Sequence, residues 1–389
     1  MFHCTTYDAI KAGEVTDIYF ARTREILKAE GLDKQVKAEF IAKTLPRDWT
    51  WGVLAGLEEV ASLLGGMNLD VRAMGEGTVF RPWQPVLEIE GMYTDFCVYE
   101  TPLLGLICQA SGIATMAARC RLAAGGRTLV SFGARRMHPI LAPFIERNAF
   151  IGGCDGVSVR AGAELIGEPP TGTMPHALIL VYGDTVEATK AFDRVVAPDV
   201  KRISLIDTFQ DEKFEAMRVA SALGDRLYAV RLDTPSSRRG NFKRLVEEVR
   251  WELDLRGFSH VKIFVSGGMG ERQIRELHPV ADGYGVGTAI SDGPVVDYSM
   301  DIVEIDGRPV AKRGKASGTK QVYRCPRCHQ DLVTPEASDP PRCACGGEME
   351  GLLNPWMERG SLVDALPPPA GIRQGVLDQL RWLRASGDP

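Results

Sequence analysis

The chain has 389 residues, too many for one ordinary hydrophobic core, which predicts two or three domains. Hydrophobic residues make up 44% of it and charged residues 25%, as in a globular protein. The formal net charge of −5 argues against bulk attraction to nucleic acid or to anionic membranes, so we expect neither as a partner.

The sequence shows no membrane-spanning run, no secretory signal and no disulfide framework, and these three observations bear on where the protein is located. No apolar run approaches the roughly 20 residues that a membrane-spanning helix needs. The N-terminal residues are charged where a secretory signal would be apolar. Nine cysteines are present, and five of them are scattered between Cys4 and Cys154 without a framework spacing. We therefore expect a cytoplasmic protein with reduced thiols.

Residues 1–115 are predicted to form an N-terminal α+β sandwich domain. Residues 51–64 carry apolar side chains at helical period, whereas the turn-flanked segments 78–80 and 86–89 read as an antiparallel strand pair. A long helix is predicted over residues 100–124. Its inward stripe consists of Leu103, Leu104, Ile107, Ile113, Met116 and Ala117.

Residues 116–298 are predicted to form an irregular α/β barrel. Short apolar segments recur, each closing on a polar or glycine-rich turn and followed by a helix-like stretch. They begin at Thr128, Gly156, His176, Arg202, Tyr228, Val261 and Tyr284. Strands alternating with helices predict parallel β/α units, for which a doubly wound sheet is the alternative arrangement. In a barrel the chemistry lies where strands end and loops begin.

Residues 299–389 are predicted to form a small C-terminal region. A hairpin-like segment, 302–310, precedes a basic stretch, a cysteine cluster, a proline-rich segment and a last amphipathic helix. The cluster consists of Cys325-x2-Cys328 and, after an intervening loop, Cys343-x-Cys345. Four thiolates in two close pairs can complete a tetrahedral site, which predicts a structural zinc knuckle over residues 325–347; bound iron is the minor alternative.

Two glycine-rich segments follow consecutive apolar strands late in the barrel. They are Ser266-Gly-Gly, with Gly267 and Gly268, and Gly285-Val-Gly-Thr, with Gly287 and Thr288. Backbone amides freed by glycine can hold an anion, and barrels commonly bind phosphate at their last two strands. Each motif alone is most often an ordinary turn, but the two in tandem predict phosphate binding.

Two aspartates, Asp207 and Asp233, end two neighbouring strands. Carboxylates at strand ends can accept hydrogen bonds from ribose hydroxyls or hold Mg²⁺. The alternative for each is an N-cap of the helix that follows.

An aromatic residue precedes two guanidinium groups in Phe132-Gly-Ala-Arg135-Arg136. A flat anionic ring needs this combination, a stacking surface and charge-assisted bonds to its carboxylate. The alternative is a surface arginine pair after a core phenylalanine. His176 is predicted to begin an apolar strand, where a lone histidine is most often structural.

Several motifs in order, over about residues 15 to 315, resemble the type II phosphoribosyltransferases, a family with nicotinate, nicotinamide and quinolinate enzymes. The segment that resembles the helix shared by these enzymes is Ser111-Gly-Ile-Ala-Thr. The motifs similar to the nicotinate branch are Thr16-Asp-Ile-Tyr19, Ala55-Gly-Leu-Glu-Glu, Phe132-Gly-Ala-Arg-Arg, Gly172-Thr-x-x-His176, Arg231-Leu-Asp233 and Gly285-x-Gly-Thr. The tail with four cysteines resembles the archaeal-type nicotinate enzymes, which carry a zinc knuckle.

The resemblance implies an activity. It is the joining of nicotinate to phosphoribosyl pyrophosphate (PRPP) in NAD synthesis, coupled to ATP hydrolysis. Asp207 and Asp233 would address the ribose and Mg²⁺, and the two glycine segments would hold the PRPP phosphates. His176 would be the histidine that ATP phosphorylates.

The resemblance also implies a homo-oligomer, at least a dimer, with sites shared between subunits. Tyr19 of one subunit would stack on the pyridine ring opposite Phe132 of the other. Arg135 and Arg231, with Arg136 beside them, would bind the carboxylate.

The sequence departs from the family pattern at two places. Ala177 stands where the family has serine after the histidine, and Thr234-Pro235 replaces a Ser-Gly-Asp run. Both departures bear on ATP coupling more than on transfer itself. The alternatives are a quinolinate phosphoribosyltransferase, which would need more positive charge near Phe132, and a non-catalytic barrel whose zinc tail binds a partner.

Overall fold

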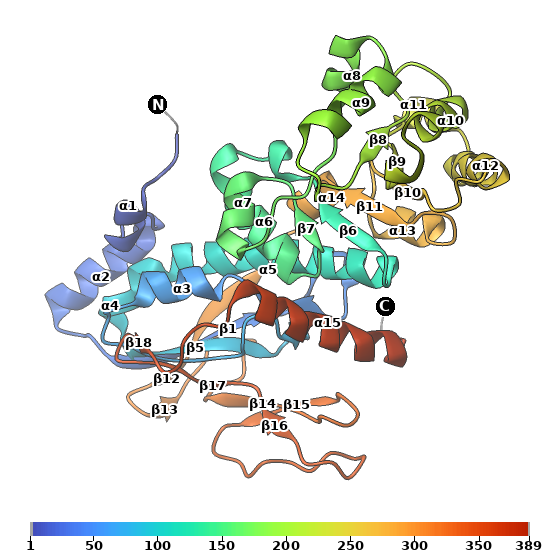
Figure 1. Cartoon of the computed structure of the whole chain (residues 1–389). Coiled ribbons are helices and arrows are strands. Elements are labelled where there is room, and N and C mark those ends of the chain that lie inside the picture. Colours follow the sequence, from blue (N-terminus) through green and yellow to red (C-terminus); the bar gives the residue numbers. More distant parts are fainter. Residues whose placement is uncertain (1–2, 388–389) are drawn as a thin grey trace. The chain divides into compact units, whose positions relative to one another are not determined.

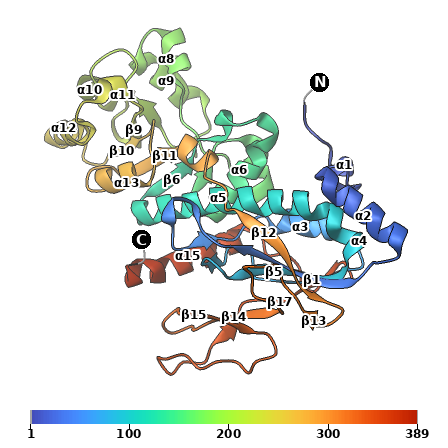
Figure 2. The same ribbon diagram turned by 180° about the vertical axis from the view of Figure 1, so that it is seen from behind.

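The computed structural model describes residues 3–387, which form two compact units (Figures 1 and 2). Unit 1 combines the described residues up to 115 with those from 294 onward, and unit 2 comprises residues 116–293. The helix α5 (Glu100–Ala124) begins in unit 1 and ends in unit 2. The C-terminal segment expected as a separate region thus clusters with the N-terminal one.

Unit 1 is built on a seven-stranded antiparallel sheet with strand order β13-β12-β1-β5-β3-β17-β18. Its strands come from both ends of the chain: β1 (Gln35–Ala42), β3 (Asp70–Ala73), β5 (Pro85–Met92), β12 (Tyr298–Ile305), β13 (Arg308–Pro309), β17 (Asn354–Glu358) and β18 (Ser361–Leu362). In β5, Val86, Leu87 and Ile89 are fully buried. Val86 and Leu87 are consecutive and point to opposite faces, so β5 is covered on both sides.

The helices of unit 1 are α1 (Tyr7–Lys11), α2 (Ile18–Glu30), α3 (Leu57–Leu64), α4 (Tyr93–Phe96), the first part of α5, and α15 (Pro369–Ser386), with 3₁₀ turns η1 (Pro46–Asp48) and η2 (Cys97–Tyr99). Helix α3 starts against α5, because a Cβ on Gly56 would lie 2.7 Å from the carbonyl oxygen of Leu106. Helix α15 buries one stripe at helical spacing: Ile372, Val376, Leu380 and Leu383.

Two expectations for residues 51–89 were wrong in detail. The helix begins only at Leu57, because Gly52–Val53 forms the short strand β2. The two expected strands exist as β4 (Val79–Phe80) and β5, but they do not pair with each other. Strand β4 pairs with β2, while β5 pairs with β1 on one side and β3 on the other.

Unit 2 contains a six-stranded parallel sheet with strand order β7-β6-β11-β10-β9-β8. The strands are β6 (Thr128–Ser131), β7 (Gly156–Val157), β8 (Ile203–Leu205), β9 (Ala229–Leu232), β10 (Lys262–Val265) and β11 (Gly283–Val286). The sheet curls into half of a barrel, which confirms the expected irregular α/β barrel (Figure 1). All four residues of β11 are buried, as in parallel sheets covered on both faces.

The connections of unit 2 are mainly helical. They comprise α6 (Ala142–Ile151), α7 (Arg160–Ile166), α8 (His176–Tyr182), α9 (Thr185–Val195), α10 (Glu212–Leu223), α11 (Ser236–Arg239), α12 (Phe242–Leu255), α13 (Glu271–Leu277) and α14 (Thr288–Ser291), with 3₁₀ turns η3 (Ala134–Arg136), η4 (Pro139–Leu141) and η5 (Gly224–Arg226).

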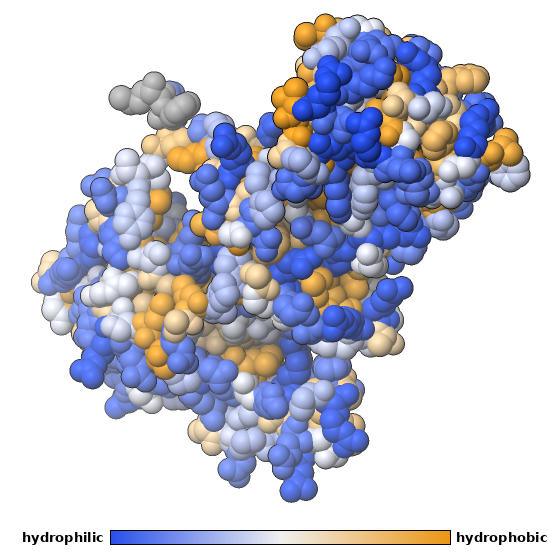
Figure 3. Space-filling model, viewed as in Figure 1, coloured by the Kyte–Doolittle hydropathy of each residue, from blue (hydrophilic) through white to orange (hydrophobic). Residues whose placement is uncertain are grey.

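The expected strand at His176 is wrong, because residues 176–182 form helix α8. The run His-Ala-Leu-Ile-Leu is apolar, and a short apolar run cannot be assigned to helix or strand by periodicity alone. Only Ile179 of this helix is buried, and Gly183 with φ of 76° ends it. Leu180, Val181 and Tyr182 are instead exposed at 58%, 85% and 48%, and Figure 3 shows apolar surface beside α8.

One helical stretch, Tyr93–Ala124, meets the length and composition of a membrane span, contrary to the expectation from the sequence. Its apolar window has a mean hydropathy of 1.3, and 72% of that window is buried inside the protein. A helix buried in the core of a protein meets the same criteria of length and composition.

A small sheet carries the cysteine cluster. Its strand order is β15-β14-β16, with β14 (Lys320–Arg324), β15 (Asp331–Pro335) and β16 (Glu350–Gly351). Cys325 directly follows β14, and the connection to β15 contains Cys328.

Candidate active site

The polar residues singled out in unit 2 gather at one edge of the parallel sheet. Asp207 follows β8, Asp233 follows β9, and the segments starting at Ser266, Gly287 and Phe132 follow β10, β11 and β6. Because the strands are parallel and adjacent, their carboxyl ends lie side by side. This is the edge at which α/β folds bind ligands.

Arg231 holds the end of β9 together with its neighbours. Its Nη1 donates to Thr173 Oγ1 at 2.7 Å, and its Nε donates to Ser266 Oγ at 2.9 Å. Its Nη2 lies 3.4 Å from Asp233 Oδ2, and the Ser266 hydroxyl donates to Asp233 Oδ1 at 2.8 Å. Burial lowers the pKa of Arg231, and the nearby carboxylates oppose that effect. A guanidinium and a carboxylate are thus fixed side by side.

His176 lies between the two aspartates. Its Nδ1 is 2.9 Å from Thr208 Oγ1, and its Nε2 is 3.6 Å from Asp207 Oδ2 and 3.7 Å from Asp233 Oδ2. Attraction to the Asp233 carboxylate raises the pKa of His176; burial opposes this effect, and Asp207 supports it. Thr208 leaves Nε2 as the nitrogen that faces the carboxylates.

The two aspartates differ in environment. Burial raises the pKa of Asp207, whose side chain is 2% exposed. Burial also acts on Asp233, but contacts with His176, Arg231 and Ser266 outweigh it and hold the pKa below the usual range. Among the described residues, the buried Asp207 Oδ1 has no hydrogen-bond partner. A buried carboxylate oxygen in this state is suited to a cation or a hydroxyl group.

The Phe132 ring lies against the last strand. A Cβ on Gly285 would come within 2.3 Å of the ring, so only glycine admits this approach. The Arg231 guanidinium carbon lies 5.1 Å from the centroid of the Phe132 ring. Arg135 and Arg136, in η3, are both exposed. The arginine in contact with the aromatic ring is therefore Arg231.

The glycine segment after β10 forms a turn with two consecutive residues in the left-handed region. Gly267 and Gly268 have φ of 74° and 62°, a conformation that side-chain-bearing residues rarely adopt. A Cβ on Gly267 would also lie 2.8 Å from Asp233 Oδ1. After β11, Gly287 precedes α14, whose first residue is Thr288, and Phe132 N donates to Val286 O at 2.8 Å.

Sequence reasoning missed Arg239, which lies beside this glycine turn. Its Nε donates to Thr234 O at 2.6 Å, and its Nη2 donates to the carbonyl oxygens of Ser266 and Gly267. Its guanidinium carbon is 4.5 Å from the centroid of the Phe242 ring. The paired arginines at 238 and 239, in the short helix α11 that follows β9, were the available signal. Thr173 and Thr208 gave no such signal.

Tyr19 belongs to unit 1, on helix α2. Its side chain is 57% exposed, and its hydroxyl donates to Asp17 Oδ2 at 3.4 Å. Its ring centroid lies 4.3 Å from that of the neighbouring Phe20.

The four cysteines of the tail come together as one cluster in unit 1. Their sulfur atoms all lie within 4.8 Å of one another, with Cys325 and Cys345 at 3.5 Å and Cys328 and Cys343 at 3.3 Å. A tetrahedral zinc–sulfur site has sulfurs about 3.8 Å apart, given metal–sulfur bonds of about 2.3 Å. These cysteines can therefore hold a metal ion, and an all-thiolate donor set suits Zn²⁺.

Two family models and several known proteins match this chain. The model described as quinolinate phosphoribosyl transferase, N-terminal domain, matches residues 17–111, and that of the C-terminal domain matches residues 113–301. Nicotinate phosphoribosyltransferase pncB1 of Mycobacterium tuberculosis is 30% identical, over 97% of this chain and 92% of that relative.

Solved structures also match. A nicotinate-nucleotide pyrophosphorylase from Pyrococcus furiosus is 53% identical, with a TM-score of 0.97 over 98% of both chains. Human nicotinic acid phosphoribosyltransferase has a TM-score of 0.75 over 94% of both chains, and at 19% identity this similarity shows the fold alone.

The contacts of His176 predict its titration. We expect its imidazole to stay charged to higher pH than a free histidine, and Asp233→Asn to lower its pKa. The associated stability is fully present below the ordinary value near 6.5 and is lost as pH rises through the folded value. NMR titration of the imidazole measures this, with Asp211→Asn as the control at an exposed helix cap. An unchanged pKa in Asp233→Asn would contradict the expectation.

Proposed function

Because the chain belongs to the quinolinate phosphoribosyl transferase family and is an enzyme, we propose that it joins nicotinate to PRPP, giving nicotinate mononucleotide and pyrophosphate. One observation carries the proposal. Two partly buried aspartates, a guanidinium and an aromatic ring meet at the carboxyl edge of the sheet, beside the two glycine-rich segments. Those are the groups needed for a ribose, an anionic ring and phosphates.

PRPP would be held by Asp207, Asp233 and the two glycine turns. The unpartnered Oδ1 of Asp207 supports a role in binding Mg²⁺ or a ribose hydroxyl, since Mg²⁺ prefers carboxylate oxygens. Backbone amides at Gly267 and Gly268, and at Gly287 and Thr288, would hold phosphate oxygens. Arg239 beside the first turn adds positive charge there.

Nicotinate would lie near Phe132. The ring of Phe132 offers stacking area, and the carboxylate would meet Arg231, which already lies over that ring, or Arg135 on the following turn. Arg136, exposed beside Arg135 in η3, adds positive charge. Arg231 would therefore contribute more to binding of the carboxylate than the sequence suggested.

The reaction displaces one group at the anomeric carbon. The pyridine nitrogen forms a bond to that carbon with its lone pair, and the carbon–oxygen bond to pyrophosphate breaks with both electrons leaving on oxygen. Positive charge develops on the ribose in between. Two carboxylates placed beside the ribose would stabilise that charge without acting as nucleophiles, so positioning and electrostatics supply the catalysis.

Quinolinate is the alternative acceptor, because the matching family models carry that name. The name of the Pyrococcus furiosus protein gives the nucleotide, nicotinate nucleotide, but does not say which pyridine is its substrate. A second carboxylate would need another cation near the attacking nitrogen, and residues 132–138 contain no lysine. We therefore favour nicotinate.

ATP coupling would run through His176. A histidine held by Thr208 on one nitrogen, with the other facing Asp207 and Asp233, can accept a phosphoryl group on Nε2. Ala177 follows His176 where the family has serine. Because this departure bears on ATP coupling and not on phosphoribosyl transfer, the two activities are tested separately.

The active assembly would be at least a dimer in the cytoplasm. Tyr19 is exposed on one unit while the ring-binding groups belong to the other, and we propose that it stacks on the pyridine held by a neighbouring subunit. The exposed apolar residues of α8 and of α2, among them Val181 and Ile18, supply surface for such contacts.

We further propose that the four cysteines hold a structural Zn²⁺. We expect about one zinc per chain, bound through four thiolates, and Cys325→Ser should release the metal and lower the unfolding temperature more than the specific activity of the remaining folded protein. Metal analysis and thermal unfolding measure this, with Cys108→Ala as the control outside the cluster. A quadruple cysteine variant of unchanged stability would refute a structural metal.

The preferred pyridine tests the central claim. Nicotinamide lacks the charge that Arg135 and Arg231 would pair with, and leaving such a group unpaired costs about 1–3 kcal/mol. We expect kcat/KM for nicotinate to exceed that for nicotinamide at least about tenfold, with quinolinate poorest. Arg135→Ala should narrow the first gap, and Arg231→Ala should remove most of it. Steady-state kinetics with PRPP decide: quinolinate as the best substrate would overturn the assignment.

Labelling tests the role of His176. Incubation with γ-labelled ATP should give an acid-labile phosphoryl label that His176→Ala abolishes, while slow transfer without ATP persists in that variant. Thr208→Val should weaken labelling, because it removes the contact to Nδ1. If the wild type takes no label and ATP leaves its rate unchanged, His176 only lines the site.

Subunit complementation tests Tyr19. Tyr19→Ala and Asp233→Asn should each be nearly inactive alone, and mixing them should restore activity because hybrid dimers contain one intact site. Mixing Asp207→Asn with Asp233→Asn is the control, because both changes lie in the same part of the site and no hybrid dimer then contains an intact site. Absence of restored activity despite proven subunit exchange would remove Tyr19 from the neighbour's site.

A further inference from the structure

Arg239, the last residue of α11, holds the turn at Gly267 and Gly268 from one side. Its Nη2 donates to the carbonyl oxygen of Ser266 at 3.3 Å and to that of Gly267, and its Nε donates to Thr234 O at 2.6 Å. One guanidinium thus joins the loop after β9 to the loop after β10. The backbone of the glycine turn is therefore oriented by this side chain.

These bonds determine where the amides of the turn point. The carbonyl of Ser266 and the N–H of Gly267 belong to one peptide unit, and the carbonyl of Gly267 and the N–H of Gly268 belong to the next. Both units are trans, and in a planar trans peptide the two groups point in opposite directions. Because Arg239 accepts neither carbonyl elsewhere but binds both on its own side, the N–H groups of Gly267 and Gly268 point away from it.

The two amides have no acceptor within the protein. Across residues 3–387, no group receives a hydrogen bond from the N–H of Gly267 or of Gly268. Gly267 is half-buried and Gly268 is exposed. A Cβ on Gly267 would lie 2.8 Å from Asp233 Oδ1, so the turn lies beside the carboxylate proposed to address the ribose. Successive N–H groups left free in a turn can bind an anion.

No carboxylate contacts Arg239 and neutralises its charge. Within the described part of the chain it forms no ion pair, whereas Asp233 is paired with Arg231 and His176. Burial lowers the pKa of Arg239, and the more distant charges of Asp233 and Asp207 oppose this effect. A carbonyl that accepts a bond from a cation polarises its peptide, which makes the N–H of that peptide a stronger donor. Arg239 therefore both orients the two amides and strengthens them.

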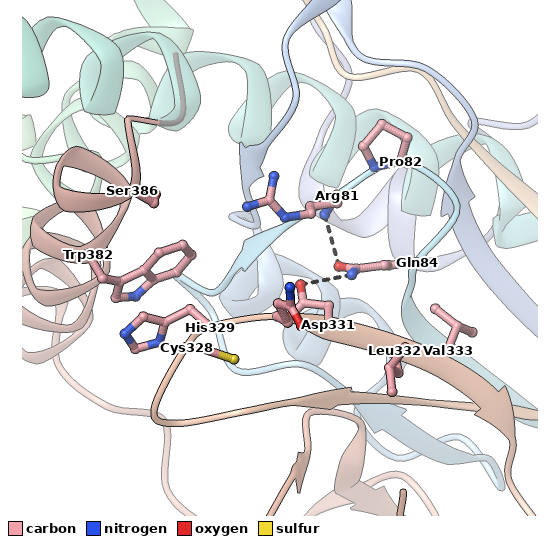
Figure 4. Close-up of a pocket in the computed structure, with 11 residues that line it drawn as sticks. Arg81, Pro82, Gln84, Cys328, His329, Asp331, Leu332, Val333, Trp382 and Ser386 are labelled. Carbon is pink, nitrogen blue, oxygen red and sulfur yellow. Dashed lines mark hydrogen bonds between the residues drawn. The ribbon is translucent and has the colours of Figure 1, made fainter. Parts of the chain in front are cut away.

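A cavity of about 850 Å³ beside the cysteine cluster of unit 1 shows the opposite situation (Figure 4). In its lining, Gln84 accepts from Arg81 N at 2.9 Å and donates to Asp331 Oδ2 at 2.9 Å. Arg324 also donates to Asp331, from Nε at 2.7 Å. These polar groups are bonded to one another, whereas the amides of the Gly267 turn have no partner in the protein.

We propose that Arg239 is a positioning residue for a phosphate group of PRPP. It presents the amides of Gly267 and Gly268 to the phosphate through its bonds to the carbonyl oxygens behind them. The inference rests on the proposed function, because it takes PRPP as the ligand. Loss of Arg239 should consequently weaken binding of ligands that carry the phosphate and spare those that lack it.

Calorimetric titration of the full chain compares ligands with and without phosphate. Nicotinate mononucleotide and nicotinate riboside differ only in the 5′-phosphate, and pyrophosphate with Mg²⁺ represents the leaving group. In the wild type we expect the mononucleotide to bind more tightly than the riboside. Arg239→Met should lower either this ratio or the affinity for pyrophosphate at least about fivefold, by loss of charge-assisted bonds. The quantity that falls identifies the phosphate, and affinity for the riboside should stay unchanged.

The neighbouring arginine supplies a matched control. Arg238 is exposed on the same helix α11. Arg238→Met removes the same charge without touching the carbonyl contacts, so it should leave all three affinities unchanged. Arg239→Lys keeps the charge and can donate to some of the carbonyl oxygens, so it should recover part of the loss.

Amide resonances of glycine-labelled protein give a readout that needs no variant. In the wild type, the N–H protons of Gly267 and Gly268 should shift downfield with nicotinate mononucleotide or with pyrophosphate, but not with the riboside. Unshifted amides with both phosphate ligands, unchanged ratio and pyrophosphate affinity in Arg239→Met, or equal losses in Arg238→Met would each overturn the inference alone. A wild type that binds neither phosphate ligand would overturn the proposed function with it.

Discussion

The attraction of Arg231 and His176 for two partly buried carboxylates organises the carboxyl edge of the parallel sheet. Strands β8 and β9 are paired in parallel, so Asp207 and Asp233 end next to each other. Two carboxylates so placed repel each other and lose hydration. Arg231 within β9, His176 on α8 and the Ser266 hydroxyl after β10 offset that cost. The network therefore sets the conformation of the loops after β7, β9 and β10 together.

The surroundings of this network leave little room for variation. Gly267 has both a left-handed backbone and a carboxylate oxygen where its Cβ would stand. Gly285 has the Phe132 ring in the same position. These glycines bring backbone close to side chains that bear charge or aromatic area. A substitution at either would alter the site by displacing Asp233 or Phe132, without removing any functional group.

Much of the fold could be read from the sequence because its signals are local. The apolar segments of β6, β8, β9, β10 and β11 each end on a polar turn, and the spacing of the four cysteines announces their cluster. What could not be read depends on tertiary partners. The apolar run of α8 resembles a strand in sequence, and only the structure shows that most of its side chains are not buried. Strand β4 resembles a partner of β5 in sequence, but β1 and β3 pair with the two edges of β5. The position of Arg239 depends on the turn at Gly267, because the Arg239 guanidinium donates to the carbonyl oxygen of Gly267.

The strand order of unit 1 has a consequence for biosynthesis on the ribosome. Strand β3, near residue 70, pairs with β17, near residue 355, and β1 pairs with β12. Unit 2 is a contiguous segment that is complete once residue 293 has been made. Translation proceeds at roughly 5–20 residues per second, so the early strands wait roughly ten seconds to a minute for these partners while unit 2 is able to fold. During that interval β1 and β3 can both pair with β5, but the outer edge of each still lacks its partner, and unpaired strand edges recruit other chains. Nascent chains halted just before residue 298 should thus be the form of this protein that most needs a chaperone.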